Sequence, residues 1–278
     1  MTECYRFEER KFSDPIFKNV DATYIIHLED NGRLPHIESQ LSEFHPTEKV
    51  YILFNKGYKK CKKKDYIDKP PKDLVDAYYT IFNNSREKKF NNILILEDDF
   101  IFDEKIKDKE HSESIDEFIN NNKNFVYYLG TLSVIQMFFF QKNNRIVLSC
   151  GSHSIIYSKK FTDYLLDNVQ QVTVEDWDIF LHLNFCNRFK YHKPLCYQLF
   201  PETENSKYWG GSNFILLLCT TLWKEVIKIL NLDTEPKFGF HFMEITSRIL
   251  FWLIIFVFIC ILLLVYNYIK SITFLKLK

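Results

Sequence analysis

The stretch NNILILEDDF, Asn91–Phe100, places four aliphatic residues directly before three consecutive carboxylates. A short apolar run of this kind is typical of a strand that is buried on both faces of a sheet. Glu97, Asp98 and Asp99 repel one another unless a positive charge lies among them. The stretch therefore predicts a buried strand that ends at a charged site.

Two strands and two helices are predicted upstream of this stretch. DATYIIHLE (21–29) and EKVYILFN (48–55) have the β-branched and aromatic composition of buried strands. RLPHIESQLSEF (33–44) and DLVDAYYTIFNNS (73–85) have apolar residues at helical spacing. This alternation of strand and helix indicates an α/β fold with a parallel sheet. Because such sheets bind ligands at the carboxyl ends of their strands, we expect the three acids in that crevice.

The acidic cluster is a candidate metal site. Side chains alternate along an extended backbone, so Glu97 and Asp99 are predicted to face one way and Asp98 the other. Two carboxylates that face a cleft suit Mg²⁺ or Mn²⁺, which takes its remaining ligands from water and substrate phosphates. A solvated turn after a strand is an equally acceptable interpretation of the same residues.

The later half of the chain is less regular. VIQMFFF (134–140) and RIVLSCGSHSIIYS (145–158) are each predicted to form one strand. VEDWDIFLHLNF (174–185) has the pattern of a short helix with acidic residues at its start.

Composition excludes some classes of protein. Lys+Arg and Asp+Glu are equal at 36 each, so no global basic field favours nucleic acid. The seven cysteines are odd in number and form no CxxC pair. This pattern predicts unpaired thiols in a reducing compartment and no structural zinc.

The C-terminal region predicts a membrane anchor. ILFWLIIFVFICILLLVY (249–266) contains no charged residue, and with its flanks it matches the roughly 20 residues that cross a bilayer. Little chain follows it, and the charged N-terminus lacks a signal peptide, which favours a tail anchor with the main domain in the cytosol. The predicted parts are a lead (1–18), one main domain (19–210), a juxtamembrane segment on the membrane surface (211–246), a transmembrane helix (247–269) and a basic tail (270–278).

Several segments together resemble the metal-dependent GT-A-fold glycosyltransferases, particularly family 25 and its relatives in large DNA viruses. That family includes lipopolysaccharide glycosyltransferases and collagen galactosyltransferases. The resemblance covers roughly residues 22–209 and rests on TYIIHLEDNGRLPHIESQL (23–41), ILILEDDFIF (93–102), GSHSIIYSKKF (151–161) and EDWDIFL (175–181). NKGYKKC (55–61) and PLCYQLFPETENSKYW (194–209) resemble the viral members specifically.

The resemblance implies a GT-A-like, Rossmann-type nucleotide-diphospho-sugar transferase domain. Glu97, Asp98 and Asp99 then match the family's DxD-type motif, which binds a divalent metal that bridges the diphosphate of a UDP-sugar. Asp99 is the implied direct ligand, together with Glu97. Asp98 is expected to contact the ribose or a metal-bound water. Sugar transfer in the family is generally inverting.

An inverting transfer needs a carboxylate that removes the proton of the acceptor hydroxyl. The candidates are three acids in VEDWDIF (174–180). Asp178 is preferred slightly because it fits the family's Asp-x-x-Leu pattern through Leu181. Asp176 comes second and Glu175 third.

Other residues are candidates for binding the donor. Arg33 is expected either to bind the nucleotide or to be an ordinary surface arginine at a helix start. His153 is expected either to approach the sugar or metal or to be a structural histidine. The lysines at 59, 60, 62, 63 and 64 fit an anionic donor, a lipid headgroup or a solvated loop. The resemblance is imperfect at Glu29, Asp30 and Asn31, where the family often has a basic pair.

The sequence thus predicts a membrane-anchored glycosyltransferase that moves a hexose from a UDP-sugar to a glycan, glycolipid or protein acceptor. The alternative is a catalytically inactive, tail-anchored interaction protein with the same fold. A third possibility is a nucleotidyl or phosphoryl transferase. Against it, none of the seven glycines forms a phosphate-binding loop motif.

Overall fold

The computed structural model describes residues 4–185, 187–200 and 214–276. Its centre is a nine-stranded sheet of order β1-β3-β2-β4-β9-β6-β10-β8-β7, and β5 pairs with β11 in a second, two-stranded sheet. The strands are β1 (Tyr5–Lys11), β2 (Ala22–Leu28), β3 (Lys49–Asn55), β4 (Asn92–Glu97), β5 (Phe100–Phe102), β6 (Val126–Tyr128), β7 (Leu132–Met137), β8 (Asn143–Cys150), β9 (Ser154–Ser158), β10 (Arg188–Tyr191) and β11 (Cys196–Gln198). The helices are α1 (Leu34–Glu43), α2 (Pro70–Glu87), α3 (Lys109–Asn121), α4 (Lys159–Asn168), α5 (Trp177–Asn184), α6 (Phe214–Ile229) and α7 (Pro236–Lys276).

The predicted α/β fold is confirmed, and the parallel arrangement holds where the acidic cluster lies. β2 runs parallel to both β3 and β4. β1 and β9 are antiparallel to their neighbours β3 and β4, so the sheet as a whole is mixed. β7 and β8 are joined by a short turn, which requires antiparallel pairing because parallel strands need a long crossover.

Two predicted strands end earlier than expected, and a residue with positive φ follows each end within three positions. Gly151 has φ 93°, and it separates β8 from β9 where the sequence predicted one strand. Phe140 has φ 59°, and residues 138–140 form a turn after β7 instead of its last residues. A positive φ interrupts the extended backbone that a strand requires.

Helices cover both faces of the sheet because alternate strand residues point to opposite sides. Ile25 and Leu94 lie in a core cluster with Ile37 of α1 and Ile115 of α3. The neighbouring strand residues Tyr24 and Ile95 lie in a second cluster with residues of α2, α4 and α5. The two clusters hold the ends of β2, β3 and β4 rigidly between layers of helices.

The C-terminal region is packed more closely against the domain than the sequence indicated. The predicted domain ended at residue 210, with 211–246 on the membrane surface. In the structure, Leu232 and Phe240 are fully buried against Leu132 of β7 and Tyr197 of β11. The start of α7 therefore belongs to the folded domain.

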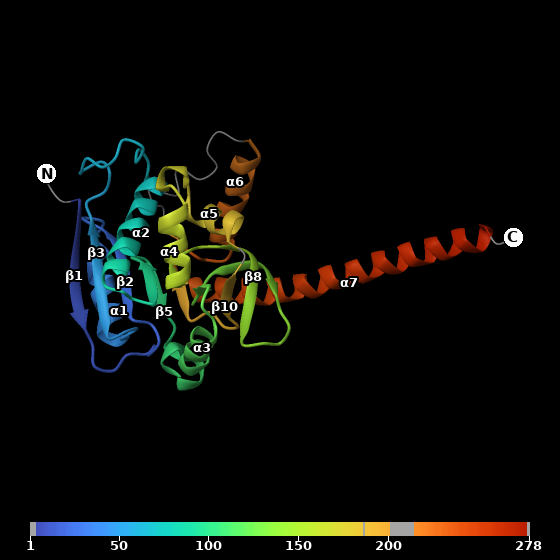
Figure 1. The fold of residues 1–278 in the computed structure, drawn as a ribbon, viewed down its shortest axis with the longest axis horizontal. Coiled ribbons are helices and arrows are strands. Elements are labelled where there is room, and N and C mark those ends of the chain that lie inside the picture. Colours follow the sequence, from blue (N-terminus) through green and yellow to red (C-terminus); the bar gives the residue numbers. More distant parts are fainter. Residues whose placement is uncertain (1–3, 186, 201–213, 277–278) are drawn as a thin grey trace.

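Beyond its docked start, α7 leaves the domain as a long exposed helix (Figure 1). Pro236–Lys270 is long and apolar enough to cross a membrane, and its most apolar window has a mean hydropathy of 3.3. Only 6% of that window is buried, which is unlike the core helix of a soluble domain. The helix contains the predicted span of residues 247–269.

The prediction of unpaired cysteines is wrong for Cys4 and Cys61, which form a disulfide. Their Cα atoms are 5.6 Å apart although 57 positions separate them in the sequence. Antiparallel pairing of β1 with β3 brings the two segments together, and spacing along the chain cannot show this. Among the described residues, Cys150, Cys196 and Cys260 are free thiols. Because two cysteines are paired, the cysteine pattern no longer favours a reducing compartment.

Reduction of this disulfide is expected to lower the free energy of unfolding by about 4 kcal/mol, the loop-entropy estimate for a bridge of this span. The measurement is urea unfolding of the full chain in detergent, with and without dithiothreitol. A Cys4→Ser/Cys61→Ser variant should match the reduced protein. In a Cys150→Ser control, the effect of dithiothreitol should persist. An unfolding midpoint that reduction does not move would contradict the expectation.

Candidate active site at the carboxyl ends of β2, β3 and β4

A cleft of about 540 Å³ opens at the carboxyl ends of the three parallel strands. Its walls come from the segments that follow β2 and β3 and from the acidic turn after β4. Glu97, Asp98 and Asp99 all line it, as does Arg33. The crevice that was expected at the carboxyl ends of the parallel strands is thus present, and the acidic cluster lines it.

Asp98 is held by donors from the protein. Its two carboxylate oxygens accept hydrogen bonds from the backbone N–H of Leu28 (3.2 Å), Asn31 Nδ2 (2.5 Å) and Arg33 Nη1 (2.6 Å), and His27 Nδ1 lies 3.3 Å away. Burial opposes ionisation, but His27 and Arg33 outweigh it and lower the pKa of Asp98. Asp98 therefore connects the end of β2 to the turn after β4, and both of its carboxylate oxygens accept hydrogen bonds from the protein itself.

The pKa values of Glu97 and Asp99 are raised, in contrast to that of Asp98. Burial, followed by the charges of Asp99 and Asp178, raises the pKa of Glu97 to about 8. Burial and the charge of Asp98 raise the pKa of Asp99 to about 7. Near neutral pH Glu97 is thus mostly protonated and Asp99 partly protonated, unless a cation replaces the protons.

The hydrogen-bond partners of these two acids come from distant segments. Glu97 Oε1 accepts from Ser152 Oγ (2.9 Å) and from the Tyr78 hydroxyl (3.2 Å). Asp99 Oδ2 accepts from Gln198 Nε2 at 3.3 Å, whereas Asp99 Oδ1 is buried with no hydrogen-bond partner. Ser152 and Gln198 lie in segments that carry the family resemblance. Tyr78 gave no signal, because it occupies an apolar position of a helix.

The predicted alternation of the three acids stops at Glu97. β4 ends there, and Asp98 and Asp99 form a turn. Arg33 Nη1 lies 2.6 Å from Asp98 Oδ1 and 3.4 Å from Asp99 Oδ2. Asp98 and Asp99 thus share one guanidinium instead of facing opposite ways. Arg33 is therefore a positive charge inside the cluster and not an ordinary surface arginine.

The arrangement fits a divalent cation that takes most of its ligands from elsewhere. Among the described residues, no group of three or more His, Cys, Asp or Glu side chains is placed to hold a metal. Glu97 and Asp99 nevertheless offer hard oxygen donors, including the unpartnered Asp99 Oδ1. Mg²⁺ and Mn²⁺ accept such a small protein ligand set when waters and phosphates complete the shell.

The three candidate base residues have different environments. Asp178, in the first turn of α5, is half-buried and accepts a hydrogen bond from the backbone N–H of Gly151 at 3.3 Å. Burial and the charge of Asp176 raise the pKa of Asp178 to about 7, and Asp178 in turn raises that of Glu97. Asp178 therefore belongs electrostatically to the acidic cluster, although it does not line the cleft itself.

Asp176 and Glu175 make structural contacts. Asp176 caps α5, because its Oδ1 accepts a hydrogen bond from the backbone N–H of Ile179 at 3.0 Å. Glu175 is exposed and forms ion pairs with Lys69 (2.5 Å) and Lys72 (3.0 Å) of the neighbouring α2 region. The hydrogen bond from Lys69 lowers the pKa of Glu175, whereas burial raises that of Asp178.

His153 is fully buried behind the acidic turn. Its Nε2 lies 3.3 Å from the carbonyl oxygen of Cys196, and its ring packs edge-on against Phe240. Burial lowers its pKa to about 4, so the imidazole is neutral at physiological pH. His153 does not line the cleft.

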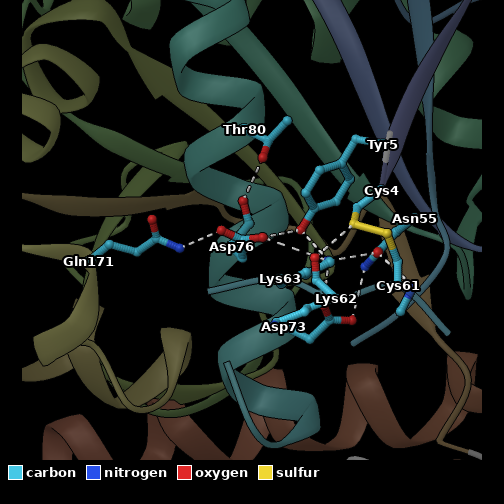
Figure 2. Close-up of polar contacts among 11 residues, drawn as sticks. Cys4, Tyr5, Asn55, Cys61, Lys62, Lys63, Asp73, Asp76, Thr80 and Gln171 are labelled. Carbon is cyan, nitrogen blue, oxygen red and sulfur yellow. Dashed lines mark hydrogen bonds and ion pairs between the residues drawn. A yellow bond between two sulfur atoms is a disulfide. The ribbon is translucent and has the colours of Figure 1, made fainter. Parts of the chain in front are cut away.

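The predicted lysine run separates into two kinds of residue. Lys59 and Lys60 line the cleft together with Lys56, and Lys60 pairs with Asp30 across its rim at 2.9 Å. Lys63 instead lies in a buried network beside the Cys4–Cys61 disulfide (Figure 2). Its Nζ contacts the carboxylate of Asp73, Asn55 Oδ1 (2.8 Å) and the Tyr5 hydroxyl (2.5 Å).

This network and the disulfide fasten both ends of the segment that carries the basic wall. The Tyr5 hydroxyl donates to Asp76 of α2 at 2.6 Å, so β1, the loop after β3 and α2 are joined at one point (Figure 2). Removing one partner of a buried ion pair is costly because it leaves the other charge uncompensated. The wall formed by residues 56–60 is therefore a fixed part of the cleft.

Among known proteins, this chain shows remote similarity to solved structures. No protein-family model and no curated protein matches this chain. Among solved structures it is similar to A197 from STIV, with 12% identity and a TM-score of 0.40 over 66% of this chain and 87% of that chain. It is also similar to a glycosyltransferase involved in the glycosylation of the major capsid of PBCV-1, with 9% identity and a TM-score of 0.35 over 59% and 76%. These similarities are too remote to assign an activity.

The raised pKa values predict a pH dependence of stability. Glu97, Asp99 and Asp178 hold protons up to about pH 7 or 8 in the folded chain, whereas unfolded carboxyls lose theirs near pH 4. Between these limits the folded chain binds more protons at these three groups, so their contribution to stability falls as pH rises.

We therefore expect the melting temperature of the metal-free protein to fall between about pH 6.5 and pH 8. Below that range His153 and His192, whose pKa values burial lowers to about 4, oppose the trend. Mn²⁺ competes with the protons of the carboxyl groups, so its stabilising effect should grow over the same range. Differential scanning fluorimetry of the full chain measures both trends. A Glu97→Gln/Asp99→Asn variant should lose most of the pH slope, and a wild-type curve without slope would contradict the expectation.

Proposed function

We propose that this chain is a membrane-anchored, metal-dependent glycosyltransferase that transfers a hexose from a UDP-sugar to a glycan, glycolipid or protein acceptor. The observation that carries the proposal is that Glu97 and Asp99, two carboxyl groups with raised pKa values, line one cleft with Lys56, Lys59 and Lys60. Asp99 Oδ1 is in addition buried without a hydrogen-bond partner. A cation with a diphosphate complements that combination of charges. The resemblance to family 25 supplies the reaction class.

The acidic and the basic residues of the cleft have different roles in the proposed donor binding. Glu97 and Asp99 would hold Mn²⁺ or Mg²⁺, which when bound neutralises charge on the leaving diphosphate. Lys56, Lys59 and Lys60, which line the same cleft, add positive charge around the same anion. Asp98 and Arg33 act as positioning residues, because Asp98 uses its acceptors to fix the turn that carries Asp99.

Asp178 is the proposed general base. In an inverting transfer the acceptor oxygen forms a bond to the anomeric carbon while the bond from that carbon to the diphosphate breaks. The proton of the acceptor hydroxyl goes to the base, and UDP leaves. A carboxylate with a pKa of about 7 is well matched to accept a proton at neutral pH.

The proposal is tested with the full chain in nanodiscs, because residues beyond 210 belong to the folded core. UDP release is measured with a panel of UDP-sugars, with Mn²⁺ and with a chelator. Metal-dependent turnover of at least one donor is expected. A protein that melts at the same temperature with and without UDP and Mn²⁺, and turns over no donor, would instead support an inactive interaction protein.

A further inference from the structure

The hairpin between β7 and β8 carries an unusual apolar tip. Three consecutive phenylalanines, Phe138, Phe139 and Phe140, begin the five-residue loop (138–142) between the two strands. Phe139 is 51% exposed and Phe140 is 78% exposed. Phe140 also has φ 59°, a conformation that disfavours a bulky side chain and favours glycine. A strained, exposed aromatic residue at a turn indicates that the side chain has a use outside the domain.

The tip lies beside the point where α7 leaves the domain. Phe139 packs edge-on against Phe251, with ring centroids 5.1 Å apart. Phe140 lies 5.8 Å from the ring of Trp252. Trp252 is 41% exposed, and most large apolar side chains of α7 that follow it are exposed too. The hairpin tip and the first exposed turns of α7 thus form one continuous apolar surface.

A buried polar network fixes the hairpin to the helix. Gln136 Nε2 of β7 donates to Glu244 Oε1 (3.1 Å) and to Ser247 Oγ (2.6 Å) of α7. Lys190 of β10 forms a fully buried ion pair with Glu244, and Arg248 donates to the same carboxylate at 2.8 Å. These contacts fix the orientation of α7 relative to the sheet edge. The position of the hairpin tip relative to α7 is therefore fixed as well.

The depth of the tip follows from the length of the helix. From residue 249 to residue 270, α7 extends roughly 30 Å at 1.5 Å per residue, which is one bilayer core. Phe251 and Trp252 then lie at one end of the core, in the region where aromatic side chains are enriched. Phe139 and Phe140 contact these two residues and so lie at the same level.

We propose that the β7–β8 tip, residues 138–140, inserts into the interfacial region of the same membrane that α7 spans. This inference rests on the proposed membrane anchoring, and not on the proposed chemistry. The occupant of the apolar surface is the boundary between lipid headgroups and acyl chains, because the surface continues directly into the exposed face of α7. Helix and hairpin then contact the bilayer at two points, which fixes the tilt of the domain.

A consequence concerns the position of the cleft. The sheet runs from β1 on one side to β8 and β7 on the side from which α7 leaves (Figure 1). Five strand spacings separate β4 from β7, or roughly 24 Å at about 4.8 Å each. The acidic cluster is therefore held away from the bilayer surface, where an acceptor must extend from the membrane or be soluble to reach it.

The test is lipid photocrosslinking of the full chain in phosphatidylcholine nanodiscs. Benzoylphenylalanine is introduced singly at Phe139, Phe140, Phe256 and Tyr164. Phe256 lies in the span and tests the anchor, whereas Tyr164, 53% exposed on α4, is the matched aromatic surface control. We expect lipid adducts at positions 139 and 140 severalfold above those at 164, as at 256.

The outcomes separate the two claims. Adducts at 256 with only background at 139 and 140 would overturn the insertion of the tip while the anchor stands. Background at all positions would overturn both. Crosslinks from 139 or 140 to a second protein chain in place of lipid would overturn the proposal and show that the apolar tip serves an interface between proteins. Crosslinks within the chain to the neighbouring Phe251 or Trp252 are counted separately. Because both positions are largely exposed, the substituted chains should melt like the wild type, and that melting temperature is measured in parallel.

Discussion

Asp99→Asn should lower kcat/KM for the UDP-sugar by about 10³-fold or more, since a bound metal supplies several kcal/mol of charge stabilisation to the transition state. Asparagine keeps the size of the side chain, and its amide oxygen binds a hard cation much more weakly than a carboxylate does. The same variant should also lose the Mn²⁺-dependent rise in melting temperature. UDP release and thermal shift, measured on one preparation, check both outcomes.

The matched control for this variant is Asp30→Asn. Asp30 lines the same cleft, but it is exposed and pairs with Lys60 on the rim. Exposed ion pairs of this kind contribute little, so its turnover should stay within a few-fold of wild type. If the two variants lost activity equally, Asp99 would not have the special role assigned to it. The metal-free Asp99→Asn protein should be at least as stable as wild type at pH 8, because one repelling buried carboxylate is gone.

Asp178→Asn is expected to reduce kcat by about 10²- to 10⁴-fold, the usual contribution of a general base. The Mn²⁺-dependent binding of UDP should remain, because Asp178 lies outside the cleft that holds the donor. Single-turnover kinetics separate the chemical step from donor binding. The pH–rate profile should also lose its acidic limb near pH 7, where the wild-type base titrates.

Asp176→Asn provides the matched control two residues away. Asparagine caps a helix about as well as aspartate, so α5 should keep its stability and the enzyme its rate. An Asp176→Asn protein that lost activity while Asp178→Asn kept it would reverse the assignment of the base. Retained activity in both variants would exclude these two acids as the base.

The sequence predicted the part of the fold that depends on local pattern. The aliphatic run before Glu97 and the two upstream strand–helix pairs were sufficient to predict β2, β3 and β4 in parallel, with the acids at their carboxyl ends. Hydrophobic periodicity, and the order in which strands and helices follow one another along the chain, can be recognised from the sequence without the tertiary structure. The exposed apolar helix at the C-terminus was equally visible, because length and composition alone define it.

Long-range pairings were beyond the sequence. The turn that directs Asp98 toward Arg33 and the network that buries Lys63 join residues that are many positions apart. The same holds for Cys4 and Cys61, which only the pairing of β1 with β3 brings together. Likewise, the sequence favoured Asp178 only slightly over Asp176 and Glu175. In the structure Asp176 caps a helix, Glu175 pairs with Lys69, and burial raises the pKa of Asp178.

By itself, the sequence determined an α/β chain with an acidic strand end and an apolar C-terminal helix, because apolar periodicity and residue order encode those features directly. Tertiary structure decided which carboxylates are fastened and which hold protons near neutral pH. It also decided where the domain ends and which aromatic residues lie beside the helix as it leaves the domain. The physical reason is that burial, hydrogen bonding and the field of neighbouring charges depend on three-dimensional proximity, which sequence distance does not measure.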